Sequence, residues 1–199
     1  ATLTNNGTTT LNADLTTTSL DGTGGLDLKT NTITAETGSY GGAISGTGTL
    51  TKTGASDLSL SGTSSYSGTT DLQAGKIILG SDDALGTSNV TMATGSTLSS
   101  STNGITVAND IAATGSVTLE STSGTQTYSG ILSGTGANLT KAGSGTVLLD
   151  AANTYTGDTT VSDGTLETSG TGTLSDDTDV TVAGGATYTV GVTDTIQSL

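Results

Sequence analysis

Residues 139–166 read LTKAGSGTVLLDAANTYTGDTTVSDGTL, and residues 50–79 read LTKTGASDLSLSGTSSYSGTTDLQAGKIIL. Both segments alternate aliphatic residues with Thr or Ser, as in Leu58 and Leu60 or in Val147 and Leu149. A period of two predicts short β-strands that have one apolar and one polar face. Gly ends most of these runs, which favours tight corners. The two segments therefore predict an all-β chain of short strands and sharp turns.

The two segments are parts of a longer internal repeat. Residues 6–98 align with residues 103–188, and most shared positions lie 88 or 89 residues apart. We interpret the recurring positions as structural: Lys52, Gly54, Tyr66, Gly68 and Gly75, and their counterparts Lys141, Gly143, Tyr155, Gly157 and Gly164. We expect a single domain, residues 1–199, made of two tandem modules at about 1–100 and 101–199.

Composition narrows the choice of all-β fold. The 199 residues include 31 Gly and five Tyr, but no Phe, Trp, Pro, Cys or His. A β-sandwich needs larger inward side chains to fill a core about 10 Å thick. A parallel β-helix needs only thin layers of Val, Ile, Leu and Ala, each stacked on the layer below. We therefore predict a parallel β-helix of about eight to ten coils, with roughly 20–25 residues in each coil.

Charge and hydropathy exclude several classes of partner. Eighteen acidic residues against four lysines give a net charge of −14, so no basic patch for nucleic acid or anionic lipid can form. No apolar run approaches the ~18–20 residues of a membrane span, so we expect no membrane insertion by this segment. The N-terminal ATLTNNGTTT lacks the features of a signal peptide, so we expect any leader to be removed or to lie outside this sequence.

Residues 50–79 and 139–166 resemble the autotransporter-associated β-strand repeat of bacterial passenger regions. The usual form of that repeat is close to LTKTGxGTLTLSGxNTYxGxTTVxxGTL, and the second segment matches it better than the first. The resemblance implies a right-handed parallel β-helix that is exported to the outer cell surface or the extracellular space. It implies no particular activity, because these repeats usually build a stalk.

Paired carboxylates are the first candidates for catalysis, since polysaccharide-cleaving β-helices use them. The pairs Asp82-Asp83 and Asp176-Asp177 recur at corresponding points of the two modules. A position that recurs with the repeat is more simply a turn former, because Asp stabilises turns through its side chain. We therefore expect no catalytic residue and no cofactor, and we keep a polysaccharide-processing enzyme as a distant alternative.

Calcium is the next candidate ligand. Asp176, Asp177 and Asp179 offer the carboxylate oxygens that calcium prefers. Calcium-binding β-rolls need several consecutive glycine–aspartate loops, however, and this chain has only one imperfect copy, at residues 22–28. We favour a solvated acidic surface over a metal site.

The recurring lysines and tyrosines invite structural interpretations. We expect Lys52 and Lys141 to be exposed and to pair with acids on a neighbouring coil. We expect Tyr66 and Tyr155 to pack at a corner, with each hydroxyl reaching solvent.

The functional expectation is a non-enzymatic stalk or passenger segment of an adhesin-like surface protein. An alternative is a self-assembling extracellular filament, because the end coils of a β-helix expose unpaired strand edges. We expect end-to-end self-association or continuation in a longer polypeptide, and a host or surface glycan or a protein as the ligand class.

Overall fold

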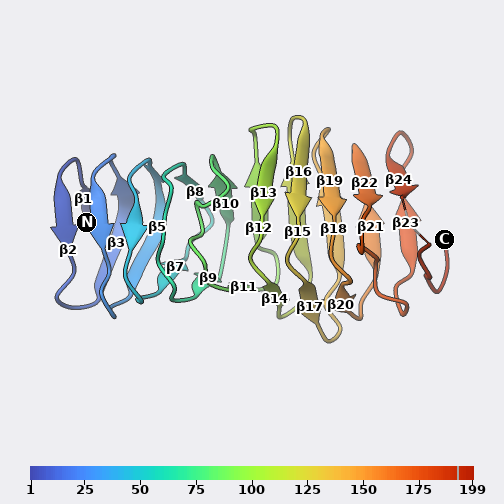
Figure 1. Cartoon of the computed structure of the whole chain (residues 1–199), viewed down its shortest axis with the longest axis horizontal. Coiled ribbons are helices and arrows are strands. Elements are labelled where there is room, and N and C mark those ends of the chain that lie inside the picture. Colours follow the sequence, from blue (N-terminus) through green and yellow to red (C-terminus); the bar gives the residue numbers. More distant parts are fainter. Residues whose placement is uncertain (192) are drawn as a thin grey trace.

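The computed structural model describes residues 1–191 and 193–199. These residues form 24 strands and no helix, so none of them belongs to a helix that could cross a membrane. The strands pair in parallel and stack along one long axis, with the two termini at opposite ends (Figure 1). The nearest strands run downward while the chain advances to the right, which makes the winding right-handed. The predicted right-handed parallel β-helix is confirmed.

Each turn of this solenoid places strands on up to three faces. Face 1 contains β3 (Leu15–Asp21), β5 (Ile33–Tyr40), β7 (Leu50–Lys52), β9 (Thr70–Leu72), β11 (Val90–Met92), β14 (Ile111–Ala113), β17 (Leu132–Gly134) and β20 (Thr154–Tyr155). Face 2 contains β1 (Thr2–Thr4), β8 (Asp57–Leu60), β10 (Lys76–Leu79), β12 (Thr97–Ser100), β15 (Val117–Ser121), β18 (Leu139–Ala142), β21 (Thr159–Val161) and β23 (Val180–Val182). Face 3 contains β2 (Thr8–Thr10), β4 (Gly25–Asp27), β6 (Ile44–Ser45), β13 (Ile105–Val107), β16 (Thr125–Tyr128), β19 (Thr146–Leu149), β22 (Thr165–Thr168) and β24 (Thr187–Val190).

The chain makes about nine turns, which agrees with the predicted eight to ten coils. On face 2, Thr2 pairs with Ser19 of the next coil, whereas Leu119 pairs with Lys141, so the N-terminal coils contain fewer residues than the later ones. The expected coil length was therefore too long for the N-terminal coils. These coils are shorter because β3 and β5 pass from face 1 to face 2 as continuous strands, with no loop at the corner. At about 4.8 Å per turn the stack is a rod roughly 40 Å long.

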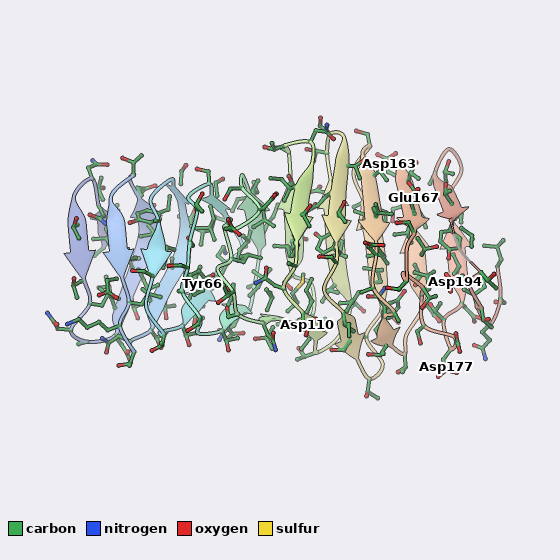
Figure 2. The ribbon with its side chains drawn as sticks, viewed as in Figure 1. Tyr66, Asp110, Asp163, Glu167, Asp177 and Asp194 are labelled. Atoms are coloured by element: carbon green, nitrogen blue, oxygen red, sulfur yellow. The ribbon has the colours of Figure 1, made fainter. Side chains whose placement is uncertain are left out.

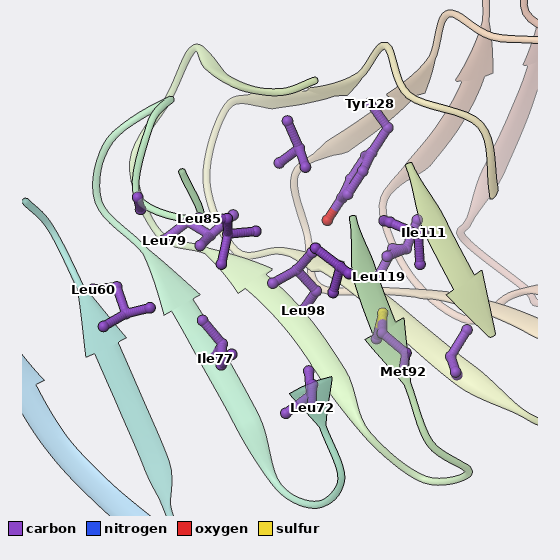
Figure 3. Close-up of a cluster of buried hydrophobic side chains, with 14 of the residues drawn as sticks. Leu60, Leu72, Ile77, Leu79, Leu85, Met92, Leu98, Ile111, Leu119 and Tyr128 are labelled. Carbon is purple, nitrogen blue, oxygen red and sulfur yellow. The ribbon is translucent and has the colours of Figure 1, made fainter. Parts of the chain in front are cut away.

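The core is a column of thin aliphatic layers between the faces. Ile77, Leu98 and Leu119 occupy one inward row of face 2 on consecutive coils, and all three are fully buried. Figure 3 shows this row beside the inward side chains of face 1. One continuous buried cluster extends from Leu11 to Val180. Because each fully buried aliphatic side chain contributes roughly 1.5–3 kcal/mol, the stack is stabilised without Phe or Trp.

Face 3 is interrupted between β6 and β13, where the described chain forms irregular segments and a turn instead of strands. Residues 82–87 are turn residues, and Ala84 and Leu85 are buried within them. Their side chains fill the interior where strand residues would otherwise point inward, so the core continues through the interruption.

The two sequence repeats do not lie directly above one another. Leu50 on face 1 is followed in the same row by Thr70, Val90, Ile111 and Leu132 on successive coils. Leu139, the repeat counterpart of Leu50, follows Leu132 closely in the chain and begins β18 on face 2. The spacing of the two repeats is thus four turns plus one side, and the second repeat is rotated by one face.

Candidate functional site

Lys52 ends β7 and is fully buried at the corner that follows this strand. Its Nζ donates hydrogen bonds to the carbonyl oxygens of Thr53 at 2.5 Å, Gly54 at 2.8 Å and Ala74 at 3.1 Å. Thr53 and Gly54 belong to the same corner, whereas Ala74 belongs to the next coil. We call this ammonium group with its three carbonyls the first lysine corner; it holds two successive coils together.

The second lysine corner has the same composition. Lys141 in β18 is fully buried, and its Nζ donates to the carbonyl oxygens of Ala142 at 2.9 Å, Gly143 at 2.6 Å and Asp163 at 2.9 Å. Asp163 lies on the next coil, just as Ala74 does in the first corner. The two corners therefore reproduce one arrangement on two different faces.

Burial of these lysines contradicts the expected exposed ion pairs. An ammonium group has three N–H donors and no acceptor, so three converging carbonyls satisfy it without a carboxylate. Burial lowers the pKa of both Lys52 and Lys141, and nearby carboxylates, such as those of Asp57 and Glu36 beside Lys52, act in the opposite direction. The lysine stem adds a length of aliphatic chain to the core, which a shorter polar residue would not do.

Glycines shape both corners. Gly54 and Gly143 have φ angles of +70° and +77°, which L side chains rarely adopt. A Cβ built at Gly75 would lie 2.5 Å from the Gly54 carbonyl oxygen and 3.0 Å from Lys52 Nζ. A Cβ at Gly164 would similarly lie 2.5 Å from the Gly143 carbonyl oxygen. The recurring glycines at these positions leave room for carbonyls that face the ammonium group.

A second glycine pair lies where neighbouring coils meet most closely. A Cβ at Gly68 would lie 2.1 Å from the Gly48 carbonyl oxygen, and one at Gly157 would lie 2.4 Å from the Ala137 carbonyl oxygen. Real Cβ atoms do not approach backbone this closely, so both positions require glycine for a steric reason.

The recurring tyrosines are also internal. Tyr66 and Tyr155 are almost fully buried, and their hydroxyls hydrogen-bond at 2.5 Å to the hydroxyls of Thr70 and Thr159 respectively. Both rings are buried, and the prediction that the hydroxyls reach solvent was wrong. Burial raises the pKa of Tyr66, and it raises the pKa of Tyr155 to about 12. The hydrogen bond to the threonine hydroxyl gives each tyrosine hydroxyl a partner inside the core, so neither needs to reach water.

The acid pair Asp82-Asp83 occupies the centre of a turn. The backbone N–H of Ala84 donates to the carbonyl oxygen of Ser81 at 3.3 Å, which closes the turn around the two aspartates. Asp82 Oδ1 accepts a hydrogen bond from the Thr106 N–H of the following coil at 2.9 Å. This geometry supports the structural interpretation of the pair.

The pair Asp176-Asp177 occupies an equivalent turn, closed by the Thr178 N–H on the Ser175 carbonyl oxygen at 3.1 Å. No group of three or more acidic, His or Cys side chains that could hold a metal ion occurs among the described residues. Asp176, Asp177 and Asp179, the calcium candidates, therefore do not converge. Figure 2 shows Asp177 and other labelled acids at different levels and on different sides of the stack.

The remaining lysines leave little positive charge on the surface. Lys76 is paired with Glu120 at 2.6 Å, and both side chains are partly exposed. Burial raises the pKa of Glu120, but hydrogen bonds from Lys76 and Ser99 outweigh this effect, so the net pKa is lowered. Lys29 is exposed. The solvent-facing surface is therefore predominantly acidic.

The residues of the two lysine corners lie in segments that match a known sequence family. The family model for the passenger-associated-transport-repeat matches residues 50–79 and 139–168. The two segments that repeat in the sequence are thus similar to passenger-associated-transport-repeats. No curated protein and no solved structure matches the chain. The match agrees with the expected resemblance to autotransporter passenger regions.

Each passenger-associated-transport-repeat contains one complete set of corner residues: the lysine, its glycines and the buried tyrosine. The recurring lysines hold one coil to the next, and the recurring tyrosines are bonded within their own coil. Repeats and solenoid together fit an autotransporter passenger-type structural module, and the repeat family implies a secreted or surface-exposed location.

Sequence reasoning missed the role of Asn153. Its Oδ1 accepts from the Leu132 N–H at 2.8 Å, and its Nδ2 donates to the carbonyl oxygens of Ala151 at 2.8 Å and Thr173 at 2.7 Å. One amide thus connects three coils. The available signal was the recurrence of a small polar residue two positions before the buried tyrosine, since Ser64 makes a similar bond to backbone in the first repeat.

Sequence reasoning also missed the apolar cavity at the C-terminal end of the stack. An apolar cavity of about 450 Å³ opens there, lined by Val182, Ala186, Thr187, Tyr188, Val190, Asp194, Ile196 and Leu199. Val190 and Leu199 are 51% and 84% exposed, although the equivalent inward rows of other coils are buried. The last described coil therefore presents the interior of the solenoid to its surroundings.

Proposed function

We propose that this chain is a non-catalytic spacer within an adhesin-like surface protein, holding other segments away from the cell. The observation that carries the proposal is the use of the recurring polar side chains. The lysines of the repeats are buried and bonded to the next coil, the tyrosines are buried and bonded to threonines of their own coil, and the paired acids form turns. None of these groups is arranged for proton transfer to a substrate.

A spacer has a length set by its number of coils. Inserting a second copy of residues 50–131 after residue 131 keeps every later strand on its face, because Leu50 and Leu132 lie in one row of face 1. The insertion adds four turns, or roughly 19 Å at about 4.8 Å per turn. Small-angle scattering of the purified chain measures this change. An unchanged maximum dimension would contradict the proposal, and so would a spherical particle.

Catalysis is tested separately on surface polysaccharides. We expect no release of reducing sugar by the purified chain. Release that is abolished by Asp83→Asn or Asp177→Asn, while the melting temperature is unchanged, would overturn the non-catalytic assignment.

End-to-end association is a second candidate function: the first coil of another chain would cover the apolar surface at the C-terminal end, as a further coil of a longer polypeptide would. Burying the side chains around the cavity against another coil would remove apolar surface from water, as the contacts between successive coils do in the rest of the stack. We expect sedimentation equilibrium to show concentration-dependent association that Val190→Lys abolishes. Association that survives this change would place the interface elsewhere, and a monomer at all concentrations would exclude the filament.

A further inference from the structure

Face 1 carries an outward row of small polar residues with one gap. The row consists of Thr16, Thr34, Thr51, Asp71, Thr91, Ala112, Ser133 and Thr154, each paired with the next on successive coils. Ala112 alone has no polar group in its side chain. A surface hollow of about 260 Å³ lies at this gap, lined by Asn89, Asp110, Ile111, Ala112, Ile131 and Ser133.

The hollow has fixed polar groups on its rim. Asp110 Oδ1 accepts a hydrogen bond from the Ile131 N–H at 2.8 Å, which orients the carboxylate and leaves Oδ2 for another donor. The Asn89 amide is exposed and makes no hydrogen bond within the described part of the chain, so it can both donate and accept. The Ser133 hydroxyl donates to the Ile111 carbonyl oxygen at 3.2 Å, which fixes it and leaves its oxygen to accept from a ligand.

The same hollow has an aliphatic wall. Ile131 is 41% exposed, and the other large apolar residues with such exposure in the described chain, Val190 and Leu199, lie at the C-terminal end. Its backbone is held on both sides, because its N–H bonds to Asp110 and its carbonyl oxygen accepts from the Ile111 N–H at 2.8 Å. Together with the Ala112 methyl group, this side chain offers a rigid apolar surface beside the polar rim.

An aliphatic surface next to a carboxylate, an amide and a hydroxyl matches the two sides of a sugar ring, whose C–H groups are apolar and whose hydroxyls both donate and accept. The volume is below the roughly 300–1,000 Å³ of pockets for drug-sized ligands, so it suits one ring. The net charge of −14 and the Asp110 carboxylate disfavour an anionic sugar. We propose that this hollow binds one non-anionic sugar residue, neutral or amino, of a surface glycan.

The experiment uses the full chain and four trisaccharides: cellotriose, chitotriose, its deacetylated form, and a chondroitin sulfate fragment as the anionic comparator. Isothermal titration calorimetry should show saturable binding of at least one of the first three. Ala112→Thr places the residue found elsewhere in the row into the gap, and it should weaken that binding at least tenfold. Its melting temperature should be unchanged, because Thr91 already occupies the same row.

Two further variants sharpen the test. Asp110→Asn keeps an acceptor for the Ile131 N–H but removes the charge, so it should weaken the deacetylated sugar more than the neutral ones. Thr34→Ala makes a similar small side chain in the same row several coils away, and it should leave binding unchanged. The proposal is overturned if none of the three non-anionic sugars saturates the chain, if Ala112→Thr binds as well as the original, or if only the sulfated fragment binds. None of these outcomes affects the length test of the spacer.

Discussion

Lys141 on face 2 occupies the position that is equivalent to that of Lys52 on face 1. Each ammonium group meets two carbonyls of its own corner and one carbonyl of the next coil, although the corners lie on different sides of the rod. The repeated sequence therefore encodes a strand, a corner and the following strand. It does not encode a particular side of the solenoid.

This relationship separates the sequence period from the structural period. Residues that are equivalent in the structure lie one coil apart, as Ile77 and Leu98 do. Residues that are equivalent in the sequence repeat, such as Lys52 and Lys141, lie several coils apart. Outward positions that correspond in the two repeats, such as Thr51 and Thr140, consequently face different directions. A surface feature on one repeat is not duplicated on the same side by the other.

Removing the second ammonium group should destabilise the chain strongly. Lys141→Met keeps most of the aliphatic stem but leaves three buried carbonyls without their donor. A buried polar group without a hydrogen-bond partner costs about 1–3 kcal/mol, and relaxation of the corner reduces the sum over the three carbonyls. We therefore expect a loss of about 3 kcal/mol in the free energy of unfolding. Urea denaturation followed by circular dichroism measures it. Lys29→Met, at an exposed position, is the control and should change stability by less than about 0.5 kcal/mol.

Glycine at the corner should be equally sensitive. Gly75→Ala would place a methyl group 2.5 Å from the Gly54 carbonyl oxygen at a φ of +72°, so both the contact and the backbone are unfavourable. We expect a loss of at least about 2 kcal/mol, which thermal and urea unfolding can measure. Gly184→Ala, where an added Cβ meets nothing within 4 Å, should cost far less. Equal effects of the two substitutions would mean that the close approach at Gly75 is not real.

The strand interiors could be predicted from sequence because alternation determines which side chains point inward. Leu58 and Leu60 are both buried, as their spacing requires. Coil length could not be predicted, because it depends on whether a corner needs a loop, and β3 turns its corner without one. The rotation of the second repeat follows from these lengths and was equally inaccessible.

Candidate sites were harder to predict than strands. A lone lysine is ordinarily placed in water, since burying a charge is costly. Lys52 is satisfied by carbonyls that converge only when two coils stack, and nothing in the local sequence marks the carbonyl of Ala74 as its partner. The hollow at Ala112 has the same origin, because it exists only through the residues above and below it in the row.

Chelation should leave the fold intact. Since the described residues hold no cluster of acids able to coordinate a metal ion, we expect the melting temperature to be the same in calcium and in excess chelator. The variant Asp179→Asn provides a check at a calcium candidate whose Oδ1 already accepts from Ser198 Oγ at 2.7 Å. A calcium-dependent rise in melting temperature that this variant removes would show that Asp179 is a ligand.

Alkaline pH should weaken the tyrosine contacts inside the core. The pKa of Tyr155 is about 12 in the folded chain and about 10 when unfolded. The unfolded state therefore releases this proton first, and the contribution of Tyr155 to stability, complete below pH 10, is lost between pH 10 and 12. The slope approaches about 1.4 kcal/mol per pH unit for this one group. Lys52 and Lys141, whose pKa values are lowered, act in the opposite sense. Comparing the original chain with Tyr155→Phe by urea denaturation across this range cancels the lysine contribution, and the variant should show the smaller decline. Parallel declines would mean that the Tyr155 hydroxyl reaches water.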